Sequence, residues 1–201
     1  MAAFGITALT FQIASGFLFG WHNEFGYLAV LNYLSHHGEA IYENQSVNGL
    51  LERWYGNGRV RFWTDTSPYP PYNPVIYAGT LLTSATLLLF GLISPVLRKC
   101  QTTTSDYVLF GLVATMASPI VWIHHYGFFY IGCIYFFAVR LKRRGNIPYS
   151  FLAAFLVLAN LWTVHGGLPG NISVLFYTYD FFAALAIILW ISSLEAQKES
   201  V

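Results

Sequence analysis

Charged residues are scarce in this chain of 201 residues, since Asp, Glu, Lys and Arg together make up only 9% of it. A soluble domain usually carries about 25% charged residues, so the composition argues against a soluble domain. Hydrophobic residues make up 56% and aromatic residues 18% of the sequence. These proportions are typical of an integral membrane protein, whose long apolar segments lie in lipid.

Cysteine is almost absent as well, because Cys100 and Cys133 are the only two. They lack metal-ligand spacing, and we interpret them as ordinary helix residues rather than as a disulfide. The formal net charge is only +1, and no basic tract is interleaved with aromatic residues. The sequence therefore gives no indication of nucleic-acid binding.

Long apolar runs are present, most of them near the length that spans about 30 Å of hydrocarbon. Their near-continuous apolarity excludes the alternating pattern of a barrel, so each run is expected to be a helix. The sequence predicts an all-α fold: a polytopic membrane helix bundle that forms one membrane domain over residues 1–201. The predicted spans are Ala3–Trp21, Pro74–Leu97, Tyr107–Ile123, Tyr126–Val139, Tyr149–Val164 and Leu175–Leu194.

Basic residues orient these spans. Clusters follow the second, fourth and sixth spans, and all fall on one side, the cytoplasmic one, if every span crosses once. The clusters are Arg98 and Lys99, then Arg140, Lys142, Arg143 and Arg144, then Lys198. The extracytoplasmic side then holds the long loop 22–73, the turn at His124 and His125, and the loop 165–173.

Two adjacent histidines, His124 and His125, stand where the third span ends. Ionisable groups this close to a membrane core indicate function, and imidazoles at the outer face could bind phosphate or pass a proton. The alternative is a helix end whose histidines bond headgroups or carbonyls. Adjacent helix residues diverge by about 100°, so we expect only one ring to face a given site. Metal ligation is disfavoured, because no Cys, Asp or Glu set lies nearby at ligand spacing.

A second polar block runs from Asn44 to Arg53 in the outer loop. We expect Asn44 to be the N-cap of a helix that runs to Trp54. Together with Gln45 and Ser46 it forms a helix start that can hold a phosphate or sugar hydroxyls, and Arg53 could clamp phosphate. The alternative is a capped surface helix with Glu52 and Arg53 in solvent.

A general base for a sugar hydroxyl would have to be an outer carboxylate. The outer carboxylates are Glu24, Glu39, Glu43, Glu52 and Asp65, and no pair of them has a diagnostic spacing. Asp65 is the catalytic candidate, because it lies in an aromatic, proline-stiffened segment of the kind that lines carbohydrate sites. A plain loop aspartate is the simpler interpretation.

Two blocks together resemble a known family. Residues 44–53 resemble the NQSxxGxLxR block, and residues 118–126 the SPxxWxHH block, of glycosyltransferase family 87. This family includes bacterial polytopic mannosyltransferases and arabinosyltransferases. The resemblance implies a GT-C fold in a bacterial-type plasma membrane, with the active site on the extracytoplasmic face. The donor would be a polyprenyl-phosphate sugar and the acceptor a lipid or glycan, with no metal or other cofactor.

The resemblance also implies roles for residues. His124 and His125 would contact the donor phosphate, while Asn44, Gln45, Ser46 and Arg53 would shape the site. It covers only the family's C-terminal half, and the family's catalytic aspartate lies in the other half. We therefore expect a fragment that lacks this aspartate, with a missing N-terminal half as partner, and Asp65 is not its equivalent by motif. The rival is a non-enzymatic membrane protein, either a lipid-binding or scaffold subunit or a haem-binding bundle.

Overall fold

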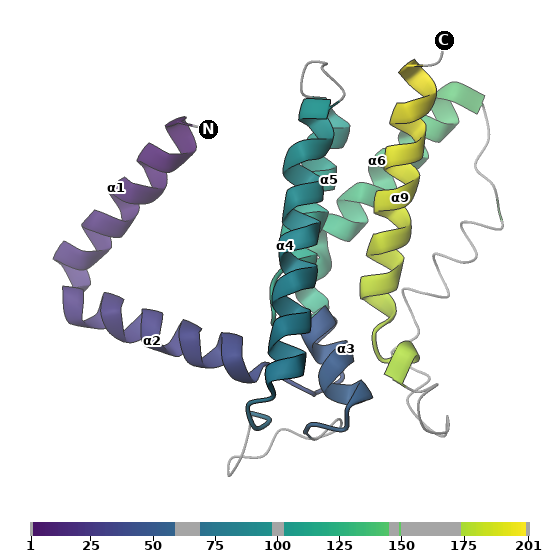
Figure 1. Cartoon of the computed structure of the whole chain (residues 1–201). Helices are drawn as coiled ribbons and strands as arrows, with labels where there is room; N and C mark the ends of the chain where they lie inside the picture. The colour runs from purple at the N-terminus through teal and green to yellow at the C-terminus, as the bar shows by residue number, and fades with distance from the viewer. Residues whose placement is uncertain (1, 59–68, 98–102, 145–148, 150–173, 200–201) are drawn as a thin grey trace. The chain divides into compact units, whose positions relative to one another are not determined.

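The computed structural model describes residues 2–58, 69–97, 103–144, 149 and 174–199, and these residues contain helices and no strand (Figure 1). The predicted all-α class is therefore confirmed for this part of the chain. The helices are α1 (Ala2–Phe19), α2 (Trp21–His37), α3 (Val47–Trp54), α4 (Pro74–Leu97), α5 (Thr104–Met116), the 3₁₀ turn η1 (Ile123–Tyr126), α6 (Gly127–Arg144) and α9 (Tyr179–Glu199).

The chain divides into two compact units, Met1–His36 and His37–Val201. In the first unit, α1 and α2 are separated at Gly20, whose φ of 90° is a conformation that glycine adopts without strain. The carboxylate of Glu24 on α2 accepts hydrogen bonds from Gln12 and Ser15 on α1. Helix α1 ends at Phe19, two residues before the predicted end of the first span at Trp21, because the turn at Gly20 interrupts the helix.

In the second unit, α5 is the central helix and packs against α4, α6 and α9. Leu112 and Val113 of α5 are fully buried, and Cys133 of α6 and Ile187 of α9 join them in one hydrophobic core. Cys133 is a free thiol in this core. This agrees with its interpretation as an ordinary helix residue, while Cys100 lies outside the described residues.

The bounds of α4 coincide with the predicted second span, Pro74–Leu97. Within the part of the chain that the structure describes, α4 is the one helix long and apolar enough to cross a membrane. Two shorter apolar helical segments, Gly5–Phe19 and Tyr179–Ser192, accompany it. The number of crossings therefore stays a prediction.

The predicted third span is too long. It was expected to reach Ile123, but α5 ends at Met116, and residues 117–122 leave the helix. Pro119 explains this early end, because proline restricts the residue before it and has no N–H to donate to a helix. The segment at 121 instead pairs with the chain at 44–45.

The other predicted spans vary in accuracy. The fourth span was predicted to end at Val139, but the corresponding helix α6 runs to Arg144. Helix α9 begins at Tyr179, after a turn, rather than at Leu175. The fifth span lies almost wholly outside the described residues. In Figure 1 the carboxyl ends of α4, α6 and α9 lie at one end of the second unit and α3 lies at the other.

Candidate functional site

The two sequence blocks that carry the family resemblance meet at the α3 end of the second unit. Asn44 and Trp122 form an isolated antiparallel bridge. The main-chain N–H of Gln45 donates to the carbonyl oxygen of Val121 at 2.7 Å. In return, the N–H of Val121 donates to Asn44 Oδ1 at 3.0 Å. Residues more than seventy positions apart are thus brought into one site.

Ser46, rather than the predicted Asn44, is the N-cap of α3. Its hydroxyl oxygen accepts the N–H of Gly49 at 3.1 Å, and the hydroxyl donates to the carbonyl of Pro119 at 2.7 Å. The prediction for Asn44 was wrong because α3 begins only at Val47, and the Asn44 side-chain oxygen accepts the N–H groups of Ser46 and Val121 instead. Both side chains are fully buried, so they join the two blocks to each other and present nothing to solvent.

Gln45 ties in a third segment, the turn before α9. Its side-chain amide donates to the carbonyl of Tyr177 at 2.7 Å, and its side-chain oxygen accepts the N–H of Asp180 at 3.1 Å. The hydroxyl of Tyr126 donates to the Gln45 carbonyl at 2.8 Å. A buried amide stabilises a fold only when its donors and acceptor are satisfied, and here they are.

Arg53 is turned into the same interior and is only 4% exposed. Its guanidinium donates to the carbonyls of Ile41 at 2.8 Å and Asn44 at 3.0 Å, and to the hydroxyl of Thr178 at 2.8 Å. Burial lowers the pKa of Arg53 to about 9, although the nearby Glu43 opposes this shift. The interpretation of a surface helix with Arg53 in solvent is therefore wrong. We call Asn44, Gln45, Ser46 and Arg53 the buried polar junction.

The glycine within the first block has a steric reason. A Cβ at Gly49 would overlap the carbonyl oxygen of Asn44 and crowd the Arg53 guanidinium. The close approach of α3 to the junction thus requires a residue without a side chain.

His124 and His125 lie on η1, between α5 and α6, and both are exposed. Their ring centroids are only 4.4 Å apart with an angle of 69° between the planes. The two rings are therefore neighbours, while the expectation that only one of them faces a given site stays a prediction. The two imidazoles meet edge to face on this 3₁₀ turn.

Trp122 completes this exposed set. Its ring lies nearly parallel to that of His125, with centroids 6.3 Å apart and 10° between the planes, and meets His124 edge-on at 5.6 Å. We call Trp122, His124 and His125 the exposed imidazole group.

The contacts of His125 define where its proton lies. The main-chain N–H of Trp122 donates to His125 Nδ1 at 3.1 Å. Burial and the neighbouring His124 both lower the pKa of His125, which favours the neutral ring. A neutral imidazole whose Nδ1 accepts a hydrogen bond must carry its proton on Nε2. His125 therefore offers an N–H donor at Nε2.

Glu39 is a residue that sequence reasoning left without a role. Its Oε2 accepts the indole N–H of Trp122 at 2.7 Å, and the residue is only 3% exposed. Burial raises the pKa of Glu39, the bond from Trp122 lowers it, and the neighbouring Glu43 raises it. No motif marked Glu39, because its partner lies 83 positions away.

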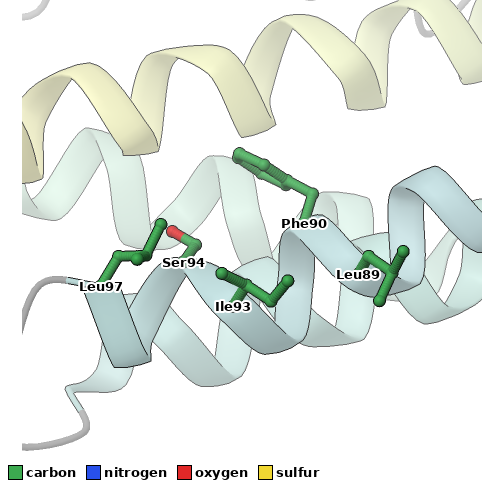
Figure 2. Close-up of a pocket in the computed structure, with 5 residues that line it drawn as sticks. All are labelled: Leu89, Phe90, Ile93, Ser94 and Leu97. Atoms are coloured by element: carbon green, nitrogen blue, oxygen red, sulfur yellow. The ribbon is translucent and has the colours of Figure 1, made fainter.

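Asp65, the catalytic candidate from sequence, lies outside the described residues. Among the residues that the structure does describe, no group of three His, Cys, Asp or Glu side chains could hold a metal ion. A hollow of about 370 Å³ on α4 lies near the carboxyl end of that helix (Figure 2). It is lined by Leu89, Phe90, Ile93, Ser94 and Leu97. With one hydroxyl among apolar side chains, it offers no catalytic chemistry.

Comparison with known proteins adds no relative: no family model, no curated protein and no solved structure matches the chain. The resemblance to glycosyltransferase family 87 therefore rests on the two sequence blocks alone.

Proposed function

We propose that this chain is part of a membrane glycosyltransferase that uses a polyprenyl-phosphate sugar as donor and a lipid or glycan as acceptor. The exposed imidazole group would bind the donor phosphate at the extracytoplasmic face. The buried polar junction would hold that group in place. The observation that carries the proposal is the meeting of the two resemblance blocks, with the histidines left at the surface.

The hydrogen-bonding state of His125 supports a phosphate ligand. Its Nε2–H is a donor, and a phosphoryl oxygen is a strong acceptor. The same state speaks against haem. A histidine that ligates a metal usually donates its other N–H to an acceptor, whereas Nδ1 of His125 itself accepts a bond from Trp122.

The apolar surfaces of the second unit support a membrane location. Leu82, Val96 and Leu97 of α4 are each more than 70% exposed, and Ile134 of α6 is 68% exposed. Large apolar side chains exposed on the helices in this way favour an apolar surrounding, and we propose lipid. The basic residues at the end of α6 would lie at the cytoplasmic surface, opposite η1.

The reaction would proceed by attack of an acceptor hydroxyl on the anomeric carbon. The bond from that carbon to the phosphate oxygen breaks, and the hydroxyl proton passes to a carboxylate. The resemblance assigns this carboxylate to a segment outside the chain. His125, through Nε2–H, and His124 would stabilise the charge that develops on the leaving polyprenyl phosphate. Preorganised donors at a developing charge are a large term in many enzymes.

Sugar transfer in membranes tests this proposal, with the chain expressed together with any N-terminal half found beside it. We expect His125→Ala to lower transfer from a radiolabelled polyprenyl-phosphate sugar by about 100-fold, the loss that one missing donor typically causes. His125→Gln, which keeps a donor near the Nε2 position, should restore part of it. His22→Ala changes an exposed histidine on α2 and serves as the control. Unchanged transfer in both His124→Ala and His125→Ala would refute the role.

A lipid-binding subunit without catalysis is the second candidate. The full hydrogen bonding of Asn44, Gln45 and Ser46 favours it, because these side chains serve the fold and offer nothing to a sugar. Such a subunit would bind polyprenyl phosphate, but sugar transfer in the membrane would be unchanged when the subunit is absent.

A further inference from the structure

The proposed function leaves the buried carboxyls of Glu52, Asp180 and Glu39 without a role, and the one bonded to the exposed imidazole group is that of Glu39. It lies between α2 and α3, and its Oε2 accepts the Trp122 indole N–H at 2.7 Å. A carboxyl that is 3% exposed is costly to bury, so its place beside the exposed imidazole group calls for a reason.

The main chain at Glu39 is fixed by the same block that forms the junction. Its N–H donates to Asn48 Oδ1 at 3.1 Å, and its carbonyl accepts from Asn44 Nδ2 at 2.9 Å. Gly38 turns the chain there with a φ of 61° and leaves room for Asn48, whose side chain a Cβ at Gly38 would overlap. Glu39 is therefore held on both sides and can act as a rigid anchor.

Trp122 transmits this anchoring to the imidazoles. Its indole is the surface that His125 faces almost in parallel and that His124 meets edge-on. Its main-chain N–H also holds Nδ1 of His125. If the indole rotated, both rings would lose a neighbour that limits their rotation.

We propose that Glu39 is a positioning residue that anchors the Trp122 indole and thereby orients His124 and His125 toward a lipid phosphate. The inference rests on the proposed function for its ligand. Glu39 acts through Trp122 and does not touch the donor. Orientation matters because a donor displaced from the phosphoryl oxygen loses most of its hydrogen bond.

The test compares Glu39→Ala, Glu39→Gln and Trp122→Phe in the purified chain, with a short-chain polyprenyl phosphate as the probe. We expect Glu39→Ala and Trp122→Phe each to weaken binding by about tenfold, and the double variant to be no weaker than Trp122→Phe alone. Glu39→Gln should bind within about twofold of the wild type, because its amide oxygen still accepts the indole N–H. Equal losses in Glu39→Gln and Glu39→Ala, or additive losses in the double variant, would overturn the proposal.

A second readout needs no ligand. In the chain labelled with ¹⁵N-histidine, the shifts of His125 report which ring nitrogen carries the proton. We expect the Nε2–H form in all three proteins, because the main-chain N–H of Trp122 holds Nδ1. The His125 shifts should match in the wild type and Glu39→Gln and should be displaced in Glu39→Ala, where the indole beside the ring loses its anchor. Unchanged shifts in Glu39→Ala would contradict the positioning role even if the wild type binds the probe. Failure of the wild type to bind would instead contradict the proposed function, and near-UV circular dichroism checks that each variant is folded.

Discussion

The buried polar junction and the exposed imidazole group are neighbours, yet the polar atoms of the first bond within the protein interior and those of the second are exposed at the surface. Asn44, Gln45 and Arg53 direct their donors to main-chain carbonyls of distant segments. His124 and His125 remain exposed, and the ring contacts they make are with each other and with Trp122. The first block thus holds the local fold together and the second stays at the surface, where the proposed ligand would bind. We call this contrast the division of labour between the two blocks.

The largest expected effect follows from the junction. Asn44→Ala would leave the buried N–H of Val121 unpaired and remove two donor bonds. We expect it to lower the free energy of unfolding by about 3 kcal/mol, the scale of an unsatisfied buried group with lost bonds. Thermal unfolding in detergent measures this. Asn32→Ala, at an exposed position on α2, is the control, and equal stability of the two variants would remove the distinction.

Gly49→Ala tests the close packing at the buried polar junction by steric overlap alone, without removing a hydrogen bond. The new methyl group would overlap the Asn44 carbonyl, and we expect a loss of about 2 kcal/mol. Gly26→Ala on α2 is the matched control, because a Cβ there meets nothing within 4 Å. An open helical position should gain up to about 1 kcal/mol from the same change. Two variants that shift the melting temperature in the same direction would contradict this account.

Much of the fold was predictable where the sequence pattern is continuous. The bounds of α4 followed from one unbroken apolar run that begins at Pro74. The end of α5 was not, because the apolar run continues past Met116 although the backbone does not stay helical. Pro119 was visible in the sequence, but the pairing of the segment after it with residues 44–45 is revealed only by the tertiary structure.

The site was predictable in its parts but not in its roles. Sequence marked both blocks, and the structure brings them together. The sequence could not reveal that Arg53 points inward, since arginine is rarely buried and a loop arginine is expected in solvent. Nor could it pair Glu39 with Trp122, because a contact between loops so far apart leaves no periodic signal.

The smallest expected effect concerns pH. Glu52 is 1% exposed, and burial raises its pKa to about 7, against a lowering by the bond from Asn57. The folded chain then holds this proton more tightly than the unfolded chain does. The contribution of the protonated Glu52 to the free energy of unfolding is full below a pH of about 4.5 and is lost as the pH rises through about 7.

Glu52→Gln removes this titration. We expect its melting temperature to fall less than that of the wild type between pH 5 and pH 8, as measured by thermal unfolding across that range. Parallel curves for the two proteins would show that Glu52 does not carry a raised pKa.

The most direct test of the division of labour is the shift in melting temperature of the purified chain on addition of polyprenyl phosphate. A ligand that binds the folded state at 100 times its Kd stabilises it by about 2.7 kcal/mol. The account predicts an upward shift in the wild type and in His22→Ala, and its loss in the double variant His124→Ala/His125→Ala, which should melt near the wild-type temperature without ligand. An undiminished shift in the double variant, or no shift in the wild type, would contradict the account.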